Sequence, residues 1–211
     1  MLIDAFLKLR PFAYHTTALR NLERIRGTRA IESTSRLFEL AGSTTDPRLR
    51  ERRRGGLQLA IDGAPVSIRD QDPLNAGAIA FDPGWDLSRF VEYLNGFAFF
   101  WPGDEHEPIP YGRGHFARYL GLGEALAVMR VPTGALFEHN RTRRILFSSV
   151  NSGSARTNQG LKQWRGEGTF RSAEAFTCTP GHVKEIVVEG AAALPPSAEF
   201  ADSLAGPWRP L

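Results

Sequence analysis

The chain has 211 residues but only one cysteine, Cys178, and no long apolar run. A single cysteine excludes an intramolecular disulfide and a structural zinc site built from several thiolates, and it fits a reducing cytoplasm. No apolar stretch approaches the ~18 residues of a membrane span. The opening MLIDAFLKLRPF is broken by charges and lacks the apolar core and cleavage site of a signal peptide. These absences predict a cytoplasmic protein with no membrane partner.

Several catalytic motifs are also missing from the sequence. It contains no dinucleotide-binding glycine fingerprint, no P-loop, no G-x-S-x-G nucleophile elbow and no H-E-x-x-H. Its five histidines lack the spacing of metal ligands. The best metal candidate is the pair His106 and His115 near the acidic residues 104, 105 and 107, and an exposed acidic loop explains that segment better. We therefore predict no metal site.

Hydrophobic residues make up 42% of the chain, with 14 Phe and 4 Trp, which is enough for a sizeable core. The formal charge is only +3, yet the basic residues cluster in RLRERRRGG (48–56) and HNRTRRILF (139–147). Clustered arginines bind phosphates or a nucleic-acid backbone, whereas any single run is more often a solvated loop. Two such runs favour an anionic partner.

Apolar spacing, caps and turn residues predict alternating short strands and helices in one α+β domain. Asp62-Gly63 predicts a hairpin turn, Asp86 a helix cap, and Thr16 or Thr17 the cap of the first helix. The expected strands are 12–17, 30–34, 97–103, 125–132, 144–150 and 182–190, and the hairpin is 57–70. The expected helices are 18–28, 35–42, 85–96 and 133–140, and residues 110–121 are expected to form a loop and one short helix. Residues 151–181 lack a clear period, and a loop of that length is often functional; Arg156 would close its first part over a substrate.

Four short motifs, separated along the chain, occur in an order that is typical of a known family. They are YHTT with His15 and Thr17, ERR (51–53), GFAFFW with Phe99 and Phe100, and HVKEIVV with Glu185. This order resembles the ADP-ribosyltransferase superfamily, and YHTTALRNLERI (14–25) is similar to the opening of its DarT-like branch. The marks RPFxYHxT, FFWPG and GPWRPL also make the chain similar, over nearly its whole length, to an uncharacterised bacterial family. The chain departs from the transferase pattern where Phe replaces a tyrosine on the middle strand.

The resemblance implies a split mixed or antiparallel β core with short flanking helices over residues 1–211, and NAD as the substrate. It assigns catalysis to Glu185, Arg53 and His15. It assigns NAD contacts to His15, Thr17 and Arg52 and to either Phe99 or Phe100, because strand alternation sends only one of the two rings into the site. Which of Arg52, Arg53 or Arg54 takes the place of the family's arginine stays open, and Arg69 is a further candidate for binding the diphosphate. Arg156 is the NAD contact expected from the loop.

The residue types suit that chemistry. A carboxylate such as Glu185 stabilises the positive charge that develops on the ribose as the nicotinamide bond breaks, and it can deprotonate the acceptor. An arginine pairs with the diphosphate through its planar fork of donors. Glu185 could also be the solvent-facing residue of an edge strand, but a carboxylate within an apolar run is typical of a shifted pKa at a site.

Several functions remain open at this level. The acceptor implied by the DarT-like resemblance and the basic runs is a base in single-stranded DNA or RNA, with an antitoxin partner by analogy. An RNA 2′-phosphotransferase shares the fold and the His-x-Thr motif but needs several spaced arginines. A degenerate scaffold that only binds a nucleotide is the non-enzymatic alternative.

Overall fold

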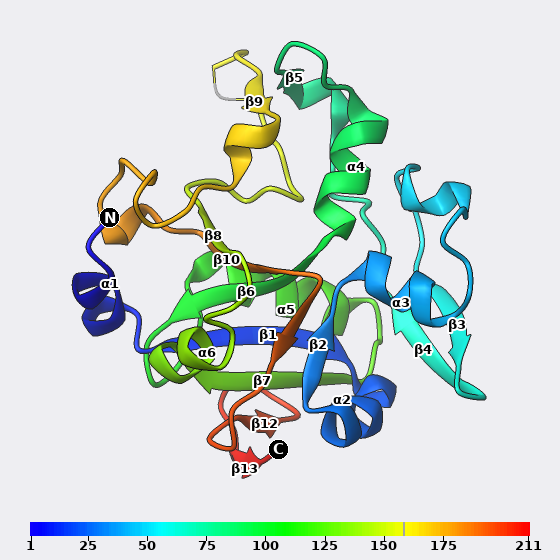
Figure 1. The fold of residues 1–211 in the computed structure, drawn as a ribbon, viewed down its shortest axis with the longest axis vertical. Coiled ribbons are helices and arrows are strands. Elements are labelled where there is room, and N and C mark those ends of the chain that lie inside the picture. Colours follow the sequence, from blue (N-terminus) through cyan, green and yellow to red (C-terminus); the bar gives the residue numbers. More distant parts are fainter. Residues whose placement is uncertain (158) are drawn as a thin grey trace.

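The computed structural model describes residues 1–157 and 159–211, and its centre is a seven-stranded sheet in which every neighbouring pair is antiparallel (Figure 1). The strands come from all parts of the chain, in the spatial order β13-β12-β7-β1-β6-β10-β8. Their bounds are β1 Phe12–Ala18, β6 Phe97–Gly103, β7 Leu126–Pro132, β8 Ile145–Ser148, β10 Glu185–Glu189, β12 Glu199–Ala201 and β13 Arg209–Pro210. The predicted α+β class is confirmed.

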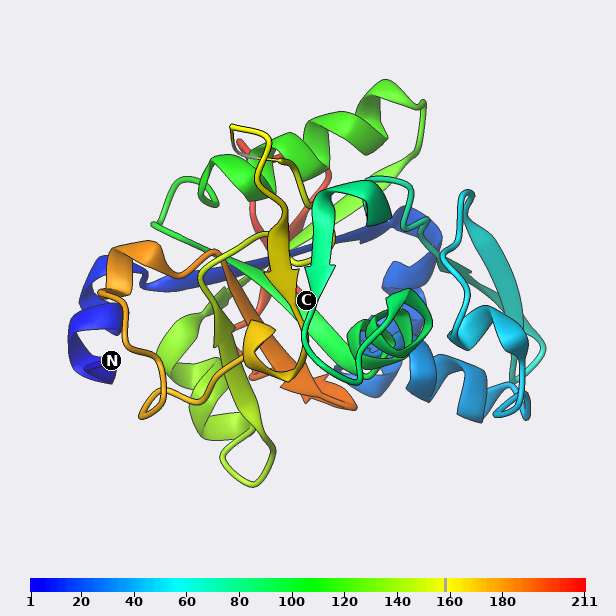
Figure 2. The same ribbon diagram turned by 90° about the horizontal axis from the view of Figure 1, so that it is seen from above.

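Helices and three two-stranded sheets surround this sheet. The α-helices are α1 Ile3–Leu9, α2 Leu22–Thr28, α3 Thr34–Leu40, α4 Leu87–Asn95, α5 Pro110–Gly121 and α6 Thr133–His139. The small sheets pair β2 Ala30–Glu32 with β11 Ala191–Ala193, β3 Leu57–Ile61 with β4 Ala64–Ile68, and β5 Ile79–Phe81 with β9 Gln163–Arg165. Short 3₁₀ turns lie at Leu19–Asn21, Pro47–Leu49, Ala76–Ala78, Glu167–Thr169 and Pro180–His182. Figure 2 shows α5 and α6 on opposite sides of the central sheet.

Local sequence signals explain many of these elements. The Asp62-Gly63 turn has positive φ at both residues, 53° and 77°, as a type I′ hairpin requires. The Asp86 side chain accepts from the Arg89 backbone N–H at 2.8 Å and caps α4 as predicted. The predicted cap of the first helix is wrong, because β1 continues through Ala18 and α2 begins only at Leu22. The loop predicted over 151–181 contains β9 and two 3₁₀ turns, residue 158 lying outside the described residues.

Strand alternation divides the core between the two faces of the central sheet. Phe100 and Ile186 point into the cluster that includes Phe6 of α1 and Leu136 of α6. Phe97, Leu146 and Val187 point to the opposite face and pack beneath Phe90 and Leu94 of α4.

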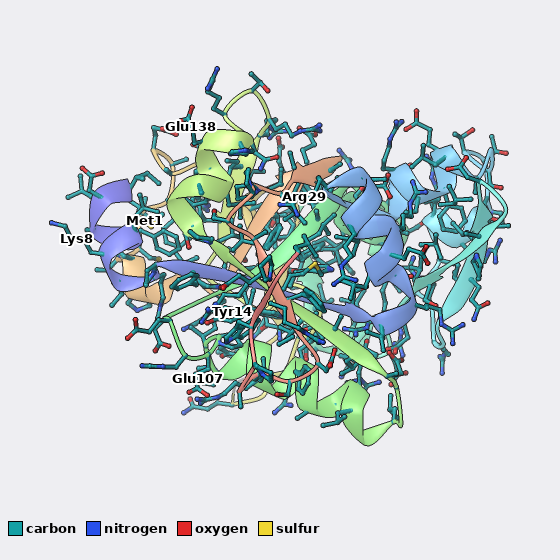
Figure 3. All side chains as sticks on the ribbon, turned by 90° about the horizontal axis from the view of Figure 1, so that it is seen from below. Met1, Lys8, Tyr14, Arg29, Glu107 and Glu138 are labelled. Atoms are coloured by element: carbon teal, nitrogen blue, oxygen red, sulfur yellow. The ribbon has the colours of Figure 1, made fainter. Side chains whose placement is uncertain are left out.

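A third cluster fixes the C-terminal segment. Tyr14, labelled in Figure 3, is fully buried. Its ring meets that of Trp208 edge-on at a centroid distance of 6.0 Å. Trp208 thereby anchors the C-terminal tail to the central sheet.

The central sheet divides between β1 and β6. The ladder between them pairs Phe12–Gly103 and Ala13–Pro102 and ends at Tyr14–Trp101. Past this point β1 stays on β7 as far as the pair Ala18–Leu126, and β6 runs along β10. Two half-sheets therefore share only a short seam and open a gap beyond it.

Helix α5 lies close to the seam because Gly112 has no side chain. A Cβ there would fall 2.8 Å from Cβ and Cγ of Trp101 and 2.7 Å from Cβ of Pro108. We expect Gly112→Ala to lower the free energy of unfolding by about 1–3 kcal/mol through overpacking. Gly114→Ala in the same helix meets nothing within 4 Å and should stabilise by up to ~1 kcal/mol. Urea titration of both variants tests the contrast, and equal stability of the two would contradict it.

Candidate functional site

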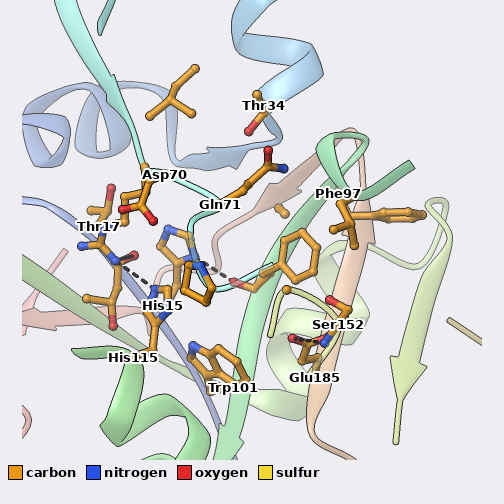
Figure 4. Close-up of a pocket in the computed structure, with 18 of the residues that line it drawn as sticks. His15, Thr17, Thr34, Asp70, Gln71, Phe97, Trp101, His115, Ser152 and Glu185 are labelled. Carbon is orange, nitrogen blue, oxygen red and sulfur yellow. Dashed lines mark hydrogen bonds between the residues drawn. The ribbon is translucent and has the colours of Figure 1, made fainter. Parts of the chain in front are cut away.

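A cavity of about 970 Å³ occupies the gap between the two half-sheets. Its walls come from β1, the segment after β4, α5, β6, the loop 149–156 and the start of β10. Its lining includes seven residues that the sequence analysis selected for the nucleotide site: His15, Thr17, Arg53, Arg69, Phe99, Arg156 and Glu185. Figure 4 shows His15, Thr17 and Glu185 around this space, with Trp101 between the histidine and the glutamate in the view.

His15 lies where β1 leaves β6, and its ring spans the opening. Its Nδ1 is 2.8 Å from the backbone oxygen of Phe99. A carbonyl oxygen only accepts, so Nδ1 carries the proton and Nε2 keeps a lone pair. Burial lowers the pKa of His15 to about 4, and the nearby Arg69 charge adds to this effect. His15 is therefore a neutral imidazole with a fixed tautomer.

A second histidine, which the sequence analysis considered only as a metal ligand, lies beside the first. His115 on α5 accepts at Nε2 from Nη1 of Arg69 at 3.1 Å, and the same Nη1 donates to the Thr16 oxygen. Burial, and then Arg69, lower the pKa of His115 to about 3. The Arg69 guanidinium also stacks 4.2 Å from the Tyr119 ring centroid. A single histidine on a helix carries no local signal that would have predicted this cluster.

Thr17 and Arg53 line the cavity but bond to the protein. Thr17 Oγ1 accepts from Asn21 Nδ2 at 2.9 Å. The Arg53 guanidinium donates from Nε to the Arg69 oxygen at 3.2 Å and from Nη2 to Asn95 Oδ1 at 3.1 Å. It thereby joins the loop before β3 to the end of α4.

Two other predicted contacts lie away from the cavity wall. Phe100 is fully buried in the core on the opposite face, so Phe99 is the ring of this pair that lines the cavity. Arg52 pairs instead with Asp72 at 3.3 Å. Strand alternation predicts that only one phenylalanine faces the site, but not which one.

Glu185 is the first residue of β10 and only 3% exposed. Both of its carboxylate oxygens lie 3.1 Å from the backbone N–H of Ser152, in the loop that follows β8. Burial raises the pKa of Glu185 to about 7, against the opposing effects of Ser152 and of the Arg165 charge. The carboxyl group is thus poised to exchange a proton near neutral pH.

The two arginine-rich runs are largely neutralised by acidic partners. In the first run, Arg48 pairs with Asp46 and Arg50 with Glu92. In the second run, Arg141 pairs with Glu138 and Arg144 with Glu189. These acidic partners all lie outside the two runs. The positive charge counted within the runs is therefore larger than the charge left unpaired in the structure.

The residues that the structure describes contain neither a cluster of metal ligands nor a membrane-spanning helix. Across 1–157 and 159–211, no three side chains of His, Cys, Asp or Glu gather as metal ligands. Within the same ranges, no helix combines the length and the hydropathy needed to cross a membrane.

A family model described as a family of unknown function, DUF7002, matches residues 11–196. The match covers most of the chain, so the protein belongs to this family. No curated protein matches the sequence. Membership of an uncharacterised family is therefore confirmed, whereas the resemblance to ADP-ribosyltransferases stays a prediction.

The raised pKa of Glu185 predicts a pH dependence of stability. Between the unfolded value of 4.5 and the folded value of about 7, the folded state holds a proton that the unfolded state has lost. Stability therefore falls as pH rises through this window. From pH 5 to pH 8 we expect the free energy of unfolding to fall by roughly 2–3 kcal/mol more than that of Glu185→Gln. Denaturant titration at both pH values tests this, and parallel pH profiles would contradict it.

Proposed function

We propose that this protein is an NAD-dependent ADP-ribosyltransferase and that the cavity between β1 and β6 holds NAD. The observation that carries the proposal is the buried carboxyl of Glu185 on the same cavity as the neutral imidazole of His15. Such a carboxylate suits a developing positive charge, and an imidazole of fixed tautomer suits the hydroxyl groups of a ribose. The order of motifs in the sequence supports the same assignment.

The proposed reaction exchanges one bond at the ribose. The bond between C1′ and the nicotinamide nitrogen breaks, and nicotinamide leaves with the electron pair. The acceptor forms a bond to C1′ and gives its proton to Glu185. Phe99 offers a ring for stacking on nicotinamide, while His15 and Thr17 border the ribose.

Arg69 and Arg156 are the residues that bind the NAD diphosphate. Both line the cavity. Arg53 remains a cavity residue, but its guanidinium already holds the backbone of Arg69 and the side chain of Asn95. We therefore assign Arg53 a supporting role in place of direct catalysis.

We take the acceptor to be a base in single-stranded DNA or RNA, reached in the cytoplasm, with an antitoxin as a partner by analogy. An unstacked base costs less to bring into a cavity than a paired one. The RNA 2′-phosphotransferase alternative is less favoured, because on the cavity wall Arg24 pairs with Glu32 and Arg118 with Asp70. Those pairs leave fewer arginines for a substrate phosphate.

Incubation of the protein with NAD labelled in its ADP-ribose half tests the proposal, with and without single-stranded DNA or RNA. We expect nicotinamide release and label transfer, and a loss of at least ~100-fold in rate for Glu185→Gln because the proton acceptor is removed. Glu189→Gln is the matched control, since Glu189 lies exposed at the far end of the same strand. NAD binding without release, in wild type, would favour the nucleotide-binding module. Absence of binding would overturn the proposal.

The pH profile of the rate is a separate test. Only the ionised carboxylate of Glu185 can accept the proton, and its pKa is about 7. The rate at saturating NAD should therefore rise about tenfold per pH unit below pH 7 and level off above it. Single-turnover rates between pH 5.5 and 8.5 measure this. A rate that falls as pH rises across this range would contradict the assigned role.

A further inference from the structure

Arg165 lies behind the loop that covers Glu185, and its side chain is the largest of the fully buried ones in the described chain. Only 2% of the residue is exposed. Its backbone is fixed by the parallel pairing of β9 with β5, in which Phe81 is opposite Arg165. The Arg165 oxygen also accepts from the Asp82 N–H at 3.0 Å. The guanidinium therefore extends from a rigid support.

The hydrogen-bond acceptors of this guanidinium are all uncharged. Nη2 donates to the Asn151 oxygen at 3.1 Å and to Gln163 Oε1 at 2.8 Å, and Nη1 donates to the Trp164 oxygen at 2.9 Å. A buried cation is costly unless an opposite charge is near. The opposite charge that acts on Arg165 is the carboxyl of Glu185.

The loop between them connects the two groups. Asn151, held by Arg165, is followed directly by Ser152, whose backbone N–H donates to both oxygens of Glu185. Ser152 is itself only 1% exposed. The Asn151–Ser152 segment thus links the guanidinium of Arg165 to the carboxylate of Glu185 through hydrogen bonds on both sides.

We propose that Arg165 is a positioning residue for Glu185, because it fixes the Asn151–Ser152 segment on the carboxylate and keeps a buried positive charge behind it. Gln163 extends the arrangement to the cavity wall, since it accepts from the guanidinium and also lines the cavity. That Glu185 is the catalytic carboxylate rests on the proposed function. The positioning of Glu185 by Arg165 does not depend on it.

The two parts of the proposal, charge and hydrogen bonding, are separable by substitution. Arg165→Met removes both the charge and the fork of donors. Arg165→Lys keeps the charge but loses the planar fork. Gln163→Ala removes one acceptor and leaves the charge in place. Arg171→Met is the control, because Arg171 is an exposed arginine of the same segment whose side chain donates only to the nearby Gly168 oxygen among the described residues.

The test is a carbon-13 NMR titration of the Glu185 carboxyl together with hydrogen exchange of the Ser152 amide. In Arg165→Met we expect the Glu185 pKa to rise by about one further unit, because the attracting charge is lost. We expect Ser152 exchange to accelerate by at least about tenfold, because the segment opens more readily. In Arg165→Lys the pKa should stay near the wild-type value while exchange still accelerates. Arg171→Met should change neither quantity.

Unchanged pKa and unchanged Ser152 exchange in Arg165→Met would overturn the inference. Uniform acceleration across β10 as well as Ser152 would also overturn it, since it would indicate a general loss of stability. If Arg165→Met does not fold, Arg165→Lys and Gln163→Ala decide: faster exchange confined to 150–154 supports the inference, and unchanged exchange overturns it. These measurements need no NAD, so a failure of the transferase proposal remains distinguishable from a failure of this one.

Discussion

The candidate site depends on the point at which β1 leaves β6, after the pair Tyr14–Trp101. Past that pair, backbone oxygens on either side of the gap lose their ladder partners, and buried polar groups need replacements. His15 donates to the Phe99 oxygen, and Arg69 donates to the Thr16 oxygen. Side-chain donors thus replace the backbone hydrogen bonds that β1 and β6 no longer form with each other. His15 and Arg69, whose side chains supply these hydrogen bonds, both line the cavity.

Burial gives the two ends of the cavity opposite electrostatic characters. At one end, burial and the nearby charge of Arg69 keep His15 and His115 neutral, so the imidazoles add no charge to the arginines that line that end. At the other end, Glu185 has a pKa of about 7 and becomes negative near neutral pH. A ligand with an anionic half and a centre that becomes positive would match both ends. This polarity follows from which groups burial neutralises, and formal charges counted along the sequence do not reveal it.

Local signals in the sequence predicted most strands, the hairpin at Asp62-Gly63 and the cap at Asp86, because each depends on residues a few positions apart. The resemblance in motif order, and not a local signal, selected His15, Glu185 and the pair Phe99 and Phe100, and strand alternation limited that pair to one ring facing the site. The ion pairs of the clustered arginines, such as Arg50 with Glu92, could not be predicted from the runs, because tertiary packing sets the partners. Arg165 went unnoticed for the same reason, since only the fold brings it behind Glu185.

The transferase pattern that the sequence resembles has a tyrosine where this chain has Phe99, and the proposed site does not depend on that hydroxyl group. Residue 99 contributes in two ways, through a backbone oxygen that fixes His15 and through a ring that lines the cavity. Neither contribution needs a hydroxyl group. By contrast, burying Arg165 and Glu185 without a direct ion pair lowers stability relative to an apolar core. A fold that retains such a costly arrangement beside a large cavity is better explained by a requirement of the site than by a requirement of folding.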